Sequence, residues 1–135
     1  MVTHLLDTSV YCQPIKGSPL PPVVARWQRL GEASLCVSVL CEAELLQGLE
    51  AKGSAGLWDR YRTLLEGRLP MLDVNREVAR VYANMAGPLI RQGRPRPVVD
   101  LLIAATARAS GLILATLNPR HFEGIEGLAV EDWSR

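Results

Sequence analysis

Short apolar segments alternate along the chain with longer segments of helical spacing, and this alternation is the feature that most restricts the fold. The apolar segments predict strands at residues 3–6, 35–39, 69–74 and 112–116, with an edge strand at 128–130. The helical segments cover residues 23–30, 39–50, 54–66, 78–89 and 100–110. Parallel neighbours need crossover connections, which are usually helical. We therefore predict an α/β fold with a short, mostly parallel sheet of four to five strands, covered on both faces.

Glycine and proline mark where several of these segments end. Gly31 and Gly111 stand where helices are expected to stop, because glycine readily adopts the left-handed conformation after the last turn. Gly87 and Pro88 are expected to kink or divide the helix that starts at Val78, since proline lacks the N–H that a helix uses. In parallel α/β sheets, ligands bind beyond the carboxyl ends of the strands. Those ends are therefore where a site is expected.

Size and composition predict one domain, residues 1–135. The chain has 135 residues and is 48% hydrophobic, which suffices for a core that needs no disulfide or structural metal. Its formal net charge of +1 gives no overall field toward nucleic acid or an anionic membrane, so RNA binding would need a local basic patch. The three cysteines form no zinc-binding pattern, and no leader or membrane span is expected. A reducing cytoplasm fits these features.

Three acids stand where apolar sequence would otherwise continue. Asp7 directly follows the first predicted strand, Glu44 lies within an apolar helix, and Asp100 begins another. Partly desolvated carboxylates that lie close together repel one another unless a cation compensates them. Mg²⁺ takes hard oxygen ligands and keeps several waters, so a few carboxylates from separate elements suffice. The pattern therefore indicates a magnesium site of the kind that nucleases use.

Each acid also has a purely structural interpretation. Asp7 could cap the turn that follows it, Glu44 could lie on a solvated helix face, and Asp100 could favour the helix dipole. Gly48, one turn after Glu44, suggests a close approach to another group, because a glycine inside a helix costs about 1 kcal/mol relative to alanine. Taken singly, the structural and functional interpretations remain open for each acid.

Four segments in succession resemble the motifs of PIN domains of the VapC toxin type. They are residues 5–10 (LLDTSV), 38–48 (SVLCEAELLQG), 100–107 (DLLIAATA) and 114–122 (LATLNPRHF). The resemblance spans nearly the whole chain. It implies a three-layer α/β/α sandwich whose acids bind Mg²⁺ or Mn²⁺ and hydrolyse phosphodiester bonds in structured RNA, often transfer or ribosomal RNA. It also implies a homodimer that is silenced by a small antitoxin protein.

The resemblance assigns roles residue by residue. Asp7, Glu44 and Asp100 match the first three acids of the family, and Thr116 matches a threonine that lines the site. Asn118 and His121 stand where related proteins often carry further acids, which bears on the number and affinity of the metals. The implied mechanism uses a metal-activated water, with Asp7 and Asp100 as direct ligands and Glu44 ligating the ion or orienting its water.

His121 and a group of arginines are the candidates for substrate binding. His121 could assist protonation of the leaving oxygen or remain a structural residue at a turn. Arg91, Arg94 and Arg96 lie in or beside a Gly/Pro-rich connection before Asp100, where they could contact phosphates or simply be solvated. The tryptophans show no stacking pattern and are assigned to the core or to a partner surface.

Two alternatives from other functional classes share features with this sequence. One is a weakly active or inactive PIN-like binding module that acts with a DNA-binding antitoxin in operon regulation, an interpretation that Asn118 keeps open. The other is an aspartyl-nucleophile phosphatase, but such enzymes use Asp-x-Asp, and Ser9 stands two residues after Asp7. Glycine-rich nucleotide motifs are absent from the sequence.

Overall fold

The computed structural model describes all 135 residues and contains one five-stranded sheet in the order β3-β2-β1-β4-β5. Every neighbouring pair of strands is parallel. The strands are β1 (His4–Leu6), β2 (Leu35–Ser38), β3 (Met71–Leu72), β4 (Ile113–Thr116) and β5 (Val130–Asp132). The helices are α1 (Thr8–Tyr11), α2 (Pro21–Leu30), α3 (Val39–Lys52), α4 (Ala55–Leu64), α5 (Arg76–Arg91) and α6 (Val98–Ala109). Short 3-10 turns lie at η1 (Gln13–Ile15), η2 (Glu32–Ser34) and η3 (Pro119–Phe122).

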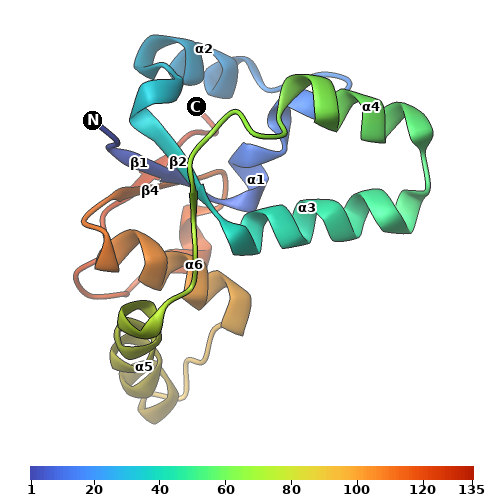
Figure 1. Cartoon of the computed structure of the whole chain (residues 1–135). Helices are drawn as coiled ribbons and strands as arrows, with labels where there is room; N and C mark the ends of the chain where they lie inside the picture. The colour runs from blue at the N-terminus through green and yellow to red at the C-terminus, as the bar shows by residue number, and fades with distance from the viewer.

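Helices cover both faces of the sheet, as the strand–helix alternation predicts. In Figure 1, α5 and α6 lie on one side of the strands, whereas α1 and α2 lie on the other. The α3–α4 hairpin extends away from the sheet as an arm (Figure 1). The predicted α/β fold is therefore confirmed.

Three predicted elements differ from those observed. The last strand lies at Val130–Asp132 and not at residues 128–130. The third strand is only Met71–Leu72, shorter than residues 69–74, because it pairs with β2 through two residues at the edge of the sheet. Helix α5 runs from Arg76 to Arg91 as one element with Pro88 inside it, so the expected division at Gly87 and Pro88 does not occur. Packing holds this helix together, because Met85, Ala86 and Leu89, on either side of Gly87 and Pro88, are buried in the core.

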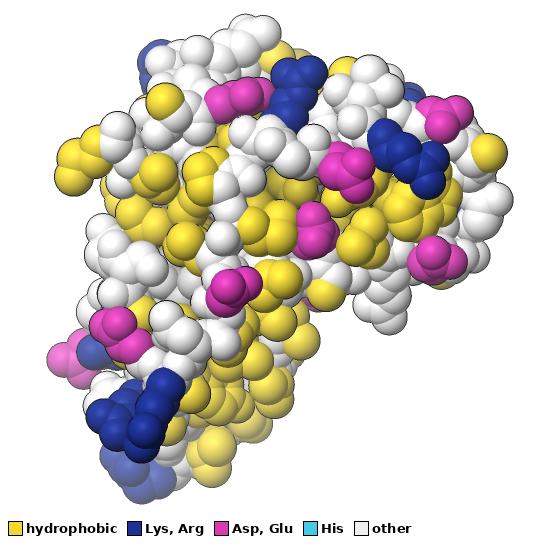
Figure 2. Space-filling model, viewed as in Figure 1, with side chains coloured by type: hydrophobic (Ala, Val, Ile, Leu, Met, Phe, Trp, Pro, Cys, Tyr) yellow, Lys and Arg dark blue, Asp and Glu magenta, His cyan; other side chains and the backbone are white.

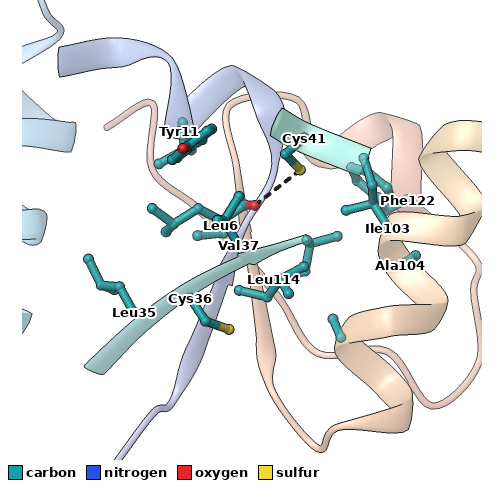
Figure 3. Packing of buried hydrophobic residues seen from close by; sticks show 14 of the residues in the cluster. Leu6, Tyr11, Leu35, Cys36, Val37, Cys41, Ile103, Ala104, Leu114 and Phe122 are labelled. Atoms are coloured by element: carbon teal, nitrogen blue, oxygen red, sulfur yellow. Dashed lines mark hydrogen bonds between the residues drawn. The ribbon is translucent and has the colours of Figure 1, made fainter. Parts of the chain in front are cut away.

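The central strands are buried on both faces, as a covered parallel sheet requires. Figure 3 shows the packing between β1, β2 and the surrounding helices, where the Cys41 thiol donates a hydrogen bond to the Leu6 carbonyl oxygen at 3.5 Å. Cys36 and Cys41 are free and buried in the core, and Cys12 is free and partly buried. Trp133 is fully buried, whereas Trp27 and Trp58 are partly buried and pack against the core. None of the helices combines the length and apolarity that crossing a membrane requires.

Candidate functional site

Asp7 lies at the carboxyl end of β1 and caps the N-terminus of α1. Its Oδ1 accepts hydrogen bonds from the Ser9 hydroxyl at 2.6 Å and from the Val10 backbone N–H at 3.1 Å. Its Oδ2 accepts a hydrogen bond from the Thr116 hydroxyl. Asp7 is buried, with only 7% of the residue exposed. Burial raises the pKa of Asp7, although the bonds from Ser9, Thr116 and Val10 oppose that rise.

The hydroxyls of Thr116 and Ser9 tie the end of β1 to the end of β4. Thr116 is fully buried at the last position of β4, and its Oγ1 also accepts a hydrogen bond from the Asn118 backbone N–H at 2.9 Å. The Ser9 Oγ accepts one from the Leu117 N–H at 3.1 Å. Parallel neighbours end at the same edge of a sheet, which is why these groups meet. Sequence reasoning singled out Thr116 but not Ser9, whose signal is a hydroxyl two residues after the first acid.

Glu44 projects from α3 toward the same edge of the sheet. Its Oε1 accepts a hydrogen bond from the Thr8 hydroxyl, and the residue is half-buried. Thr8 was another residue that sequence reasoning left unassigned. Gly48 is not in close contact with another segment, because a Cβ placed on it would meet no atom within 4 Å. The expectation of a close approach at Gly48 is therefore wrong; the position faces an open groove.

Asp100 occupies the first turn of α6, two residues after the helix begins. Its side chain is 27% exposed, and its Oδ2 lies 3.6 Å from Nδ1 of His121. His121 comes from η3 and is more exposed than Asp100, so its imidazole stands at the rim of the site. The structure thus brings the third acid and His121 together from elements that are separate in the sequence.

These side chains line one pocket of 180 Å³ at the carboxyl edge of the sheet. Its lining includes all three acids, Asn118 and His121, with Thr116 beneath Asp7. The full lining is Asp7, Thr8, Ser9, Glu44, Asp100, Ile103, Asn118, His121 and Phe122. The three acids therefore lie around one pocket. This pocket is beyond the carboxyl ends of the strands, where parallel α/β sheets bind ligands.

The arginines of the α5–α6 connection do not line this pocket. Arg96 donates hydrogen bonds to the backbone carbonyls of His121 and Glu123, and the Arg94 guanidinium lies against Gly124. Arg91 ends α5. On the face shown in Figure 2, the densest group of Lys and Arg side chains lies over α5. Phosphate contact and simple solvation are the two interpretations that the sequence leaves open for these arginines. The structure shows a third arrangement for Arg96, whose guanidinium donates to backbone carbonyls of the protein.

The donor atoms of the pocket suit a hard divalent cation. Carboxylates of Asp7, Glu44 and Asp100 and the amide of Asn118 offer oxygen ligands and no thiol, a set that favours Mg²⁺ or Mn²⁺ over zinc. No three Asp, Glu, His or Cys side chains are packed tightly enough to form a ready-made metal cage. An open arrangement still fits Mg²⁺, which is held by one or two carboxylates and retains several waters.

A second, larger groove adjoins the acidic pocket. It has a volume of 320 Å³ and lies between η1, α3 and α4. Thr8 and Glu44 line both cavities, and Lys16 and Lys52 stand on the wall of the groove. The apolar part of the groove is formed by Ile15, Leu45, Leu49 and Leu57. A chain segment seated in this groove would reach the edge of the acidic pocket.

Comparison with known proteins gives a consistent family assignment. The PIN domain profile matches residues 4–128. The chain is 34% identical over 99% of its length to the whole tRNA(fMet)-specific endonuclease VapC of Shigella flexneri. It is 33% identical to Ribonuclease VapC2 of Haemophilus influenzae, covering 98% of this chain and 99% of that protein.

Solved structures show the same architecture. The matching chain in the DNA-bound VapBC structure from Salmonella typhimurium superposes with a TM-score of 0.83 at 31% identity, covering 98% of this chain and 99% of that one. VapBC-1 from nontypeable Haemophilus influenzae gives a TM-score of 0.81 at 30% identity, covering 99% and 100% of the two chains. The three-layer α/β/α sandwich implied by the sequence motifs is therefore confirmed.

Proposed function

The chain belongs to the PIN domain family, and on that premise we propose that it is a metal-dependent endoribonuclease, the VapC-type toxin of a toxin–antitoxin pair. The observation that carries the proposal is the convergence of Asp7, Glu44 and Asp100 on one pocket beyond the strand ends. The substrate proposed is structured RNA, either transfer or ribosomal RNA. A relative named for its action on tRNA(fMet) supports this substrate class.

The proposed cofactor is Mg²⁺, with Mn²⁺ as a substitute. Asp7 and Asp100 would hold the ion, with Glu44 as a further ligand or as the group that orients a water. When bound, such an ion supplies Lewis acidity, which lowers the pKa of water and neutralises charge on the phosphate. The raised pKa of Asp7 is consistent with this role, since a buried carboxylate without a nearby cation is poorly stabilised.

The remaining residues of the pocket position the reacting groups. Thr116 and Ser9 hold the Asp7 carboxylate by donating to both of its oxygens, so its orientation does not depend on substrate. The Asn118 amide can donate a hydrogen bond to water or phosphate and accept one from water, but it adds no charge. His121, at the rim, is placed to contact the phosphate that enters the pocket.

The proposed partners are a small antitoxin and a second copy of the chain. Relatives solved as VapBC complexes support the antitoxin, and the groove beside Glu44 is the surface that we assign to it. An antitoxin segment there would block access to the acids. Exposed apolar side chains at Ile90, Val98 and Val99 support a homodimer. Both assemblies would operate in the cytoplasm.

A cleavage assay tests the proposed function. Purified, antitoxin-free protein is incubated with total RNA and either Mg²⁺, Mn²⁺ or a chelator, and the new RNA ends are sequenced. Metal-dependent cleavage at defined sites is expected, and Asp7→Asn and Asp100→Asn should each lose nearly all of it. If the wild-type protein binds an antitoxin and operator DNA but cuts no RNA, the alternative of a binding module acting in operon regulation is correct.

A further inference from the structure

A single arginine connects the two segments that carry Asp100 and His121, which lie side by side in the acidic pocket. Arg96 lies in the Gly/Pro-rich connection four residues before Asp100. Its Nη1 donates a hydrogen bond to the His121 carbonyl oxygen at 2.9 Å, and its Nη2 donates one to the Glu123 carbonyl oxygen at 2.7 Å. One planar guanidinium therefore spans the turn that includes His121.

A second arginine, Arg94, contacts the segment that follows the same turn. The Arg94 guanidinium lies against Gly124, so closely that a Cβ at that position would be 3.2 Å from one of its nitrogens. Gly124 has a φ of +74°, a left-handed conformation that favours glycine. The connection and the η3 turn therefore pack against each other, and they lie next to Asp100 and His121 respectively.

We propose that Arg96 is a positioning residue that holds the His121 imidazole beside Asp100 at the rim of the pocket. This role rests on the proposed function, in which His121 contacts the substrate phosphate. Arg96 acts through the backbone of η3 and does not bind RNA itself. Both of its terminal nitrogens already donate to carbonyls, so binding a phosphate in the same orientation would require these bonds to break.

The test uses the imidazole spectrum of nitrogen-labelled, full-length protein without RNA. The chain has only two histidines, His4 and His121, and His4 lies at the other end of β1, so it serves as an internal reference. Arg96→Gln should shift and broaden the His121 signals and leave those of His4 unchanged. Arg80→Gln, at an exposed position of α5, is the matched control and should change neither. Unchanged His121 signals in Arg96→Gln would overturn the proposal.

Cleavage kinetics provide the second arm. Arg96→Gln and His121→Asn should each reduce the turnover of RNA by about tenfold, because displacing a contact near the reacting phosphate is costly. The double variant should be no slower than the slower single variant. Losses that multiply would show that Arg96 acts independently of His121 and would contradict the proposal.

Arg96→Lys separates positioning from simple charge. Lysine keeps the positive charge but cannot present the planar fork that reaches both carbonyls, so this variant should be as slow as Arg96→Gln. Full activity of Arg96→Lys would indicate direct phosphate binding by charge and overturn the proposal. If the wild-type protein cuts no RNA, the proposed function fails, and the imidazole spectrum alone then decides the role of Arg96.

Discussion

The Thr116 hydroxyl donates a hydrogen bond to Oδ2 of Asp7, so the first acid of the pocket is held by the strand that neighbours its own. The same threonine oxygen accepts a hydrogen bond from the backbone N–H of Asn118, the residue directly before η3. One buried hydroxyl therefore orients the carboxylate and the start of η3 together. Removal of the Thr116 hydroxyl should therefore disturb the Asp7 carboxylate and the start of η3.

Thr116→Val should lower both stability and activity. Valine has the same shape but cannot donate to Asp7 or accept from Asn118, so a loss of about 1–3 kcal/mol in the free energy of unfolding is expected. The pKa of Asp7 should rise further, because one of the bonds that oppose its rise is lost. Urea denaturation and cleavage rates check this, and Thr116→Ser, which keeps the hydroxyl, should retain most of both.

Asp7→Asn should abolish cleavage while the fold becomes no less stable. Burial disfavours the charged carboxylate, and an amide of the same shape removes that cost while keeping an oxygen for the Ser9 and Val10 donors. The amide nitrogen then faces the Thr116 hydroxyl, whose oxygen can accept a hydrogen bond from it. Asp7→Ala should instead cost about 1–3 kcal/mol, since it leaves buried donors without partners. Chemical denaturation of the two variants, compared with wild type, would reveal an error if Asn proved as destabilising as Ala.

Asn118→Asp should strengthen metal binding in the absence of RNA. Divalent affinity depends on the number of carboxylates around the ion, and an amide contributes no net charge. Asn118→Ala should cost less activity than the loss of Asp7. Calorimetric titration of Mn²⁺ into wild type and Asn118→Asp measures the difference, and equal affinities would place residue 118 outside the coordination sphere.

Gly48→Ala should stabilise the protein by about 0.5–1 kcal/mol, because glycine inside a helix is entropically costly and the position has space for a methyl group. Gly53→Ala is the matched contrast. Gly53 ends α3 with a φ of +61°, so alanine there should be destabilising even though nothing crowds it. Thermal unfolding of both variants tests this, and equal shifts for the two would refute the backbone explanation.

Glu131 should make stability depend on pH. Partial burial disfavours its charge, but hydrogen bonds from Trp133 and His4, with the charges of His4 and Arg26, hold the pKa of Glu131 below its ordinary value of 4.5. A lowered pKa means that the carboxylate stabilises the fold above the unfolded-state pKa and loses this effect as pH falls through the folded-state pKa. The stability difference between wild type and Glu131→Gln should therefore be fully present above pH 4.5 and shrink as the pH falls below that value. Parallel stability curves over this range would rule out the effect.

Local sequence was sufficient to locate the acids on their elements. Asp7 follows a run of apolar residues, and Asp100 lies near the start of an apolar helix; both patterns depend only on neighbouring residues. The helix stop at Gly111 was equally local and is observed, with a φ of +66°. Pro88 shows the limit of such signals, because its local effect on α5 was outweighed by burial of the helix on both sides.

Only the tertiary structure decided how these acids are held and which polar groups face them. The strand order places β1 beside β4, and this non-local choice brings Thr116 to Asp7 across 109 positions of sequence. The Gly/Pro-rich setting of Arg96 leaves both phosphate contact and simple solvation open, yet its guanidinium binds the backbone carbonyls of His121 and Glu123. Periodicity and capping are properties of adjacent residues, and the sequence therefore determines them directly. Hydrogen bonds between distant segments depend on the order of strands and the packing of loops, which no local pattern encodes.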